Sequence, residues 1–148
     1  MGTTRDYLLD TGILILYARA STAGEAIEDR FHFRASPFKP MVSVVTLGEA
    51  RAFARYRKWG DKKLAQLDGI FGNVVPIDIS SPEVLEAYAE IHVAATSKGW
   101  GLGDNDKWIA ATTKATGATL LTTDKDFDPL HEEFISRVYI DPHTGAAE

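Results

Sequence analysis

The sequence predicts an α/β fold of three layers (α/β/α), in which helices cover both faces of a central parallel sheet. Short apolar segments at residues 7–9, 41–44 and 119–122 have the length and composition of buried strands. Longer segments of helical character separate them, and this alternation is typical of parallel strands joined by crossover helices. The chain of 148 residues suits one domain, and no linker divides it, so we expect a single domain over residues 1–148.

Local signals define each element in turn. Strands are expected over residues 7–9, 41–44, 74–77, 119–122 and 138–140, and helices over about 13–20, 24–34, 46–59, 61–71, 81–97 and 104–116. Pro76 indicates an edge strand, because proline donates no ladder hydrogen bond. Ser81 and Pro82 have the order of a helix cap and first helical residue, and Gly117 is a typical helix end. Residues 141–148 are interpreted as a loose C-terminal tail.

The composition excludes several classes of site. The chain has no cysteine, which removes disulfide scaffolds, thiolate zinc sites and cysteine nucleophiles. We find neither a signal peptide nor an apolar stretch long enough to span a bilayer, so we expect a cytoplasmic protein with no membrane contact. The net charge of −5 is unusual for a protein that binds nucleic acid. If this chain does so, it needs a local basic patch or a bound metal.

Acidic residues follow the predicted strands at one edge of the sheet. Asp10 and Asp124 come directly after strands, and the carboxyl edge of an open parallel sheet is where ligands bind. Glu49, expected in the first turn of its helix, and Asp106, at the start of another helix, reach the same edge. Clustered carboxylates repel one another unless a cation neutralises them, and oxygen ligands suit Mg²⁺ or Mn²⁺. This set predicts the metal-assisted chemistry of a phosphodiesterase.

Each of these residues also has an ordinary structural interpretation. Asp10 fits a turn or a helix cap, and Glu49, three residues after Thr46, matches a capping box. Asp104 fits an N-cap and Asp106 complements a helix dipole. These alternatives remain open from the residues alone.

Four segments together resemble the PIN domain, in particular the VapC-type toxins of toxin–antitoxin pairs. They are Tyr-Leu-Leu-Asp-Thr at residues 7–11, Ser-Val-Val-Thr-Leu-Gly-Glu at 43–49, Asn-Asp-Lys-Trp-Ile-Ala-Ala at 105–111 and Leu-Leu-Thr-Thr-Asp-Lys-Asp-Phe at 120–127. The third and fourth are specific, whereas the first two alone are weak. The resemblance covers residues 7 to about 140. One departure is Gly12, where the family often has asparagine.

The resemblance implies a Mg²⁺- or Mn²⁺-dependent endoribonuclease with a central parallel sheet. It implies that the metal ligands and catalytic residues are Asp10, Glu49, Asp106 and Asp124. It further implies that Thr122 supports them by hydrogen bonding, and we interpret Thr11, Asp104 and Asp126 as an outer layer around the ligands. An RNA substrate, a small antitoxin partner and a homodimer are the implied partners.

One basic helix face and three rival functions also bear on this interpretation. Arg51 and Arg55 share a helix face with Lys58 and are candidate contacts to an RNA backbone, or else a solvated face. The Asp-Thr-Gly triplet at residues 10–12 also occurs in aspartic proteases, but those are β-rich. A phosphatase with Asp10 as nucleophile would need a second aspartate where Gly12 stands. The alternative from another class is a non-catalytic PIN-like protein that binds nucleic acid or serves as a scaffold.

Overall fold

A parallel sheet lies at the centre of the computed structural model, which describes residues 6–148. Across these residues the strand order is β3-β2-β1-β4-β5, and every neighbouring pair is parallel. The strands are β1 (Tyr7–Leu9), β2 (Met41–Ser43), β3 (Val75–Ile77), β4 (Thr119–Thr122) and β5 (Ser136–Tyr139). The helices are α1 (Thr11–Ala18), α2 (Thr22–Phe31), α3 (Val44–Tyr56), α4 (Asp61–Phe71), α5 (Pro82–Lys98), α6 (Asp104–Thr116) and the 3₁₀ helix η1 (Lys125–Leu130).

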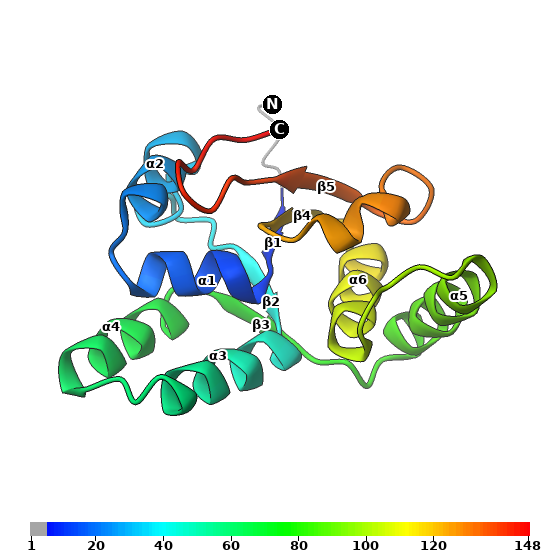
Figure 1. Cartoon of the computed structure of the whole chain (residues 1–148), viewed down its shortest axis with the longest axis horizontal. Coiled ribbons are helices and arrows are strands. Elements are labelled where there is room, and N and C mark those ends of the chain that lie inside the picture. The colour runs from blue at the N-terminus through cyan, green and yellow to red at the C-terminus, as the bar shows by residue number, and fades with distance from the viewer. Residues whose placement is uncertain (1–5) are drawn as a thin grey trace.

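The sheet separates two apolar cores, which confirms the three-layer prediction. Because alternate side chains of a strand point to opposite faces, Leu8 and Leu9 belong to different cores. Leu9 packs with residues of α1, α2, α3 and α4, whereas Leu8 packs with residues of α5, α6 and η1. Figure 1 shows α5 and α6 on the other side of the sheet from α1 and α4. Pro76 lies in β3 at the sheet edge, as predicted.

Helices α1, α2 and α3 each begin two residues before the expected position, and the N-cap of α6 is not the expected residue. Helix α3 begins at Val44 rather than about residue 46, because the Ser43 hydroxyl accepts a hydrogen bond from the Val45 N–H at 3.1 Å. Glu49 therefore lies in the second turn, and its interpretation as part of a capping box with Thr46 is wrong. Helix α6 has Gly103 as its N-cap, so Asp104 is a first-turn residue and not the cap.

Helix α5 has the start predicted for it. The Ser81 side chain accepts a hydrogen bond from the Val84 N–H at 3.2 Å, and Pro82 is the first helical residue. At the far end of α6, Gly117 has a φ of +71°, which glycine adopts without strain. No helix among residues 6–148 is both long and apolar enough to cross a bilayer.

The C-terminal segment is packed against the domain, so the prediction of a loose tail at 141–148 is wrong. Glu148 and Tyr139 exchange backbone hydrogen bonds of 2.8 and 3.1 Å. Gly145 is buried against α2 with a φ of +77°, and a Cβ added there would lie 2.7 Å from the Ala23 carbonyl oxygen. The segment therefore returns along β5 and covers the N-terminal half of α2.

Candidate functional site

Asp10 is the buried member of the predicted acidic set, with 5% of its surface exposed. Its backbone N–H donates to the carbonyl of Leu121 in β4 at 3.0 Å, which fixes it at the carboxyl edge of the sheet. One carboxylate oxygen caps α1 by accepting from the Ile13 N–H at 3.2 Å. The other oxygen accepts a hydrogen bond from the Thr122 hydroxyl. Asp10 is thus both a helix cap and a member of the site.

Thr122 joins the first and fourth motifs at the ends of adjacent strands. While its hydroxyl donates to Asp10, its oxygen accepts from the Asp124 N–H at 2.9 Å. Asp124 in turn accepts a hydrogen bond from the Asp126 N–H at 2.8 Å, which starts η1. This chain of hydrogen bonds holds the turn after β4, and it places two carboxylates beside Asp10.

Glu49 is held at the same edge from α3. The Thr11 hydroxyl donates to its Oε1 at 2.6 Å, and the Asn105 side-chain amide donates to its Oε2 at 3.1 Å. Asn105 is a site residue that sequence reasoning did not single out, although it directly precedes Asp106 in the third motif. Its contact with Glu49 links the start of α6 to α3 and fixes the carboxylate's orientation.

Three carboxylates converge closely enough to share a cation. One oxygen from each of Asp106, Asp124 and Asp126 lies within 4.8 Å of the other two. Among the described residues, none of these carboxylates lies within ion-pair distance of a lysine, arginine or histidine. An oxygen-only donor set without a compensating side chain suits a hard divalent cation. Asp126, expected in the outer layer, thus belongs to the centre.

Burial and charge crowding raise the pKa values of two carboxyl groups in the cluster. Burial raises the pKa of Asp106 to about 7, and the negative charges of Asp124 and Glu49 add to the rise. Burial also raises the pKa of Asp10 to about 6, although the hydrogen bond from Thr122 opposes this, and Asp124 contributes further. Cation binding would favour the ionised forms and so lower both values. The acidic centre, defined as Asp10, Glu49, Asp106, Asp124 and Asp126, is therefore electrostatically one unit.

Asp104 lies at the rim of the centre and is engaged elsewhere. Its carboxylate is 3.6 Å from the ammonium of Lys107, which is buried and lies 3.2 Å from the His92 ring Nδ1 on α5. Glu49 and residues 103–106 line a surface cavity of about 360 Å³. The acidic centre is thus open to solvent on this side.

Gly12 is explained by its neighbour across the site. A Cβ built on Gly12 would lie 2.2 Å from the Thr123 hydroxyl oxygen, so that hydroxyl occupies the space of a side chain at position 12. A glycine at position 12 therefore leaves room for the side chain of Thr123, which belongs to the fourth motif.

Comparisons with known proteins agree with this arrangement. The sequence profile of the PIN domain matches residues 7–132. The chain belongs to the PIN-domain family. A search of curated proteins finds no match.

Solved structures with the same fold include toxin–antitoxin complexes. A chain of VapBC2 from Rickettsia felis, bound to a promoter DNA fragment, superposes with a TM-score of 0.75 at 22% identity, covering 88% of this chain and 96% of that one. A chain of DNA-bound VapBC from Salmonella typhimurium superposes with a TM-score of 0.75 at 21% identity, covering 90% of this chain and 97% of that one. A chain of VapBC-5 from Mycobacterium tuberculosis, a member of the VapBC family of toxin–antitoxin systems, superposes with a TM-score of 0.67 at 20% identity. The superposition covers 91% of this chain and 98% of that one. At these identities the likeness establishes the fold.

The arginines predicted to contact RNA face another part of this PIN domain. Arg51 lies 4.0 Å from Asp68 and its guanidinium is 4.7 Å from the centre of the Phe71 ring, both on α4. Arg55 lines the same groove between α3 and α4, together with Leu64 and Leu67. Neither arginine lines the cavity beside the acidic centre. Both arginines are exposed, so a contact with an RNA backbone stays a prediction.

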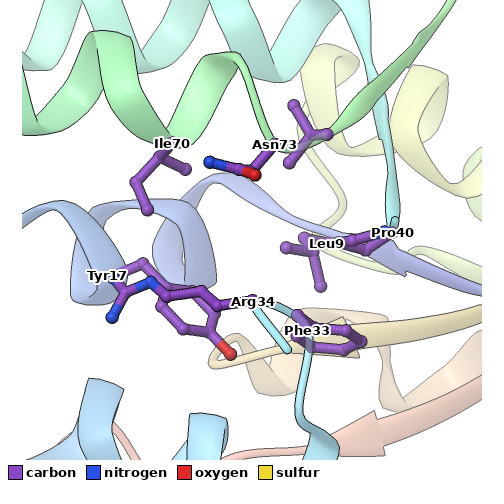
Figure 2. Close-up of a pocket in the computed structure, with 8 residues that line it drawn as sticks. Leu9, Tyr17, Phe33, Arg34, Pro40, Ile70 and Asn73 are labelled. Atoms are coloured by element: carbon purple, nitrogen blue, oxygen red, sulfur yellow. The ribbon is translucent and has the colours of Figure 1, made fainter. Parts of the chain in front are cut away.

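A second cavity in the PIN domain is too small to hold a substrate. It lies between α1, α4 and the loop after α2, and Figure 2 shows its lining side chains. Its volume of about 20 Å³ exceeds only slightly the roughly 10–15 Å³ that one water molecule requires. The lining residues are Leu9, Tyr17, Phe33, Arg34, Pro40, Ile70, Asn73 and Val74. A cavity of this size holds no substrate, so the acidic centre remains the candidate site.

Proposed function

We propose that this PIN domain is a divalent-metal-dependent endoribonuclease and the toxin of a toxin–antitoxin pair. The observation that carries the proposal is the convergence of the carboxylates of Asp106, Asp124 and Asp126 beside Asp10 and Glu49. Family membership supports the nuclease assignment, since the resemblance to VapC-type toxins rests on the motifs that supply these residues. Hydrolysis of a phosphodiester needs charge neutralisation and an activated water, and this arrangement suits both.

The ligands of Mg²⁺ or Mn²⁺ in this proposal are Asp106, Asp124 and Asp126, with Asp10 and Glu49 adjoining them. A bound cation would act as a Lewis acid, lowering the pKa of water and offsetting charge on the phosphodiester. The remaining tasks belong to the protein's own groups. Asp10 is fixed by Thr122 and Ile13, and Thr11 with Asn105 fixes Glu49, so neither carboxylate needs to reorganise.

Without a bound cation, the acidic centre holds a group that exchanges a proton near neutral pH. The carboxylate of Asp106 has a pKa of about 7 because of burial and its acidic neighbours, so it exchanges protons in the physiological range. Bound cations would shift that role to whichever carboxylate oxygen is free of the metal. The pH optimum of cleavage is therefore expected to depend on whether Mg²⁺ or Mn²⁺ is supplied.

The first test is cleavage of a mixed cellular RNA pool with Mn²⁺, with Mg²⁺ and with chelator. Asp106→Asn should abolish metal-dependent cleavage, whereas Asp128→Asn, in the same turn as Asp126 but paired with Arg137 at 3.0 Å, should retain it. Mn²⁺ at 100 times its dissociation constant should stabilise the wild type by about 2.7 kcal/mol and the Asp106 variant much less. A wild type that neither cuts RNA nor binds Mn²⁺ would favour a non-catalytic binding or scaffold function.

The toxin assignment has its own test. Structures of similar fold include VapBC toxin–antitoxin systems, which supports a small antitoxin partner. Expression of the chain should arrest growth, Asp106→Asn should relieve the arrest, and co-expression of a small protein encoded beside it should do the same. Growth arrest that Asp106→Asn leaves intact would separate toxicity from the acidic centre. Light scattering of the purified chain tests the expected homodimer.

A further inference from the structure

A basic pocket lies at the opposite ends of the two helices that carry Asp10 and Glu49. Helix α1 follows Asp10 and ends at its C-cap Arg19, and α3 carries Glu49 and ends at its C-cap Arg57. These two arginines, with Phe53, Trp59 and Lys63, line a surface cavity of about 130 Å³, here called the basic pocket. That volume accommodates several water molecules and therefore a phosphate group.

The aromatic rings of the basic pocket position its cations. The Arg57 guanidinium is 5.3 Å from the centre of the Phe53 ring, and the Lys63 ammonium is 5.6 Å from the Trp59 ring. The two rings meet edge to face, with centroids 5.8 Å apart. Cation–π contacts at such distances restrict flexible side chains. The cationic groups are thus held around one concavity.

The positive charge of the basic pocket is not used within the described chain. Arg19, Arg57 and Lys63 take part in none of the ion pairs found among residues 6–148. The C-termini of α1 and α3 each carry roughly half a negative charge, which accounts for an arginine at each cap but leaves a net surplus. The helix dipole does not explain the position of Lys63, because this lysine lies in the first turn of α4, where the dipole disfavours cations. Asp61 shares that turn and is exposed to solvent.

The pocket and the acidic centre are joined by the same helices. Asp10 and Arg19 are nine positions apart, and Glu49 and Arg57 are eight positions apart. At a rise of about 1.5 Å per residue, the distance along either helix is roughly 12–14 Å. Helices α1 and α3 run in a similar direction away from the sheet, and α4 returns beside them (Figure 1). A few nucleotides of extended single strand span such a distance.

We propose that the basic pocket binds a backbone phosphate of single-stranded RNA, a few nucleotides away from the phosphodiester at the acidic centre. This subsite rests on the proposed nuclease function. In a chain with a net charge of −5, RNA affinity requires local positive charge, and this pocket gathers three cationic side chains. Partly exposed Phe53 and Trp59 offer edges or faces for base stacking, as in other single-strand-binding surfaces.

The test is RNA binding in chelator, where metal-dependent cleavage does not occur. A short fluorescein-labelled single-stranded RNA is titrated with the wild type, with Arg57→Gln/Lys63→Gln and with Arg30→Gln/Lys62→Gln. The control pair removes the same charge and includes Arg30, which also lies over an aromatic ring (Phe31, 5.8 Å) but outside the pocket. Each lost phosphate contact costs about 0.7 in the slope of log K against log salt and roughly fivefold in affinity at 0.1 M salt.

The expected result is a roughly fivefold weaker affinity and a salt slope shallower by about 0.7 for the pocket variant, with the control pair within about twofold of the wild type. In cleavage assays with metal, the pocket variant should raise KM and leave kcat unchanged. Arg19→Gln, measured alone, should weaken the affinity by up to about fivefold and guards against misfolding of the double variant. Equal affinities of pocket and control variants would overturn the proposal, as would a wild type that does not bind RNA.

Competition experiments show whether the basic pocket prefers RNA, free inorganic phosphate or an acidic peptide. Unlabelled RNA should displace the probe at far lower phosphate concentration than inorganic phosphate does. If inorganic phosphate competes equally well, the site takes free phosphate and the RNA proposal fails. If an acidic peptide binds the wild type more tightly than RNA does, and the pocket variant loses that binding, the pocket serves an acidic protein partner instead. RNA binding through the pocket without metal-dependent cleavage would refute the nuclease function alone.

Discussion

Replacing Asp106 with asparagine should stabilise the metal-free protein at neutral and alkaline pH while removing its activity. Burial and the charges of Asp124 and Glu49 raise the pKa of Asp106 from 3.8 to about 7. A carboxyl whose pKa is raised in the folded state favours folding fully below its unfolded pKa. That contribution is lost progressively as the pH rises to the folded pKa. The free energy of unfolding of the wild type should therefore fall between about pH 4 and pH 7.

The size of the effect follows from the shift. A difference of about three pKa units corresponds to an upper limit of about 4 kcal/mol at 1.36 kcal/mol per unit. Asp106 is only half-buried, so solvent screening reduces this to roughly 1–2 kcal/mol. For a chain of this length, each kcal/mol changes Tm by about 2–4 °C, which gives a gain of roughly 2–8 °C for the asparagine variant above pH 8. Near pH 4.5 the two proteins should unfold at similar temperatures, since little of the difference has yet developed.

The assay is thermal unfolding followed by circular dichroism in chelator, for the wild type and Asp106→Asn across that pH range. Asp128→Asn is the control, because its partner Arg137 already compensates its charge. A gain in Tm that is independent of pH would contradict the electrostatic argument. A variant less stable than the wild type at every pH would show that the Asp106 carboxylate makes favourable contacts which outweigh the repulsion.

Two further predictions concern glycines with close neighbours. Gly12→Ala should cost about 1 kcal/mol, because its Cβ forces the Thr123 side chain to another rotamer, and Thr123→Ala in the same chain should restore most of it. Chemical denaturation of the two single variants and the double variant tests this, and additive losses would refute it. Gly145→Ala should cost roughly 1–3 kcal/mol, because it combines a φ of +77° with a clash against Ala23. Unchanged stability would show that the C-terminal segment does not contribute to the fold.

Parts of the acidic centre could be predicted from local sequence patterns. The positions of Asp10 and Asp124 directly after strands were sufficient to predict that they meet, because the ends of parallel strands share one edge. The capping signal at Ser81 and Pro82 was similarly sufficient, since a helix start depends on neighbouring residues only. The helix α3 start was missed because Ser43 and Thr46 are both plausible caps, and the actual choice is fixed by where β2 ends.

Other features depended on contacts that no local pattern encodes. The Asn105 amide reaches Glu49 across 56 positions of sequence, and Asp126 joins the carboxylate cluster only because η1 turns back from β4. The sequence made Arg51 a candidate RNA contact, and only the structure places its guanidinium beside Asp68 and Phe71 of α4. The basic pocket likewise arises from the ends of three helices.

The sequence by itself therefore determined the order of strands and helices, the parallel sheet and the acidic residues at its edge. These follow from hydrophobic periodicity, turn chemistry and motif spacing, which act over a few residues or one crossover unit. The tertiary structure alone decided which carboxylates lie within 4.8 Å of each other, how far burial raises the pKa of Asp10 and Asp106, and which cations face one another. Distances and desolvation depend on how helices pack, and packing is a property of the whole chain.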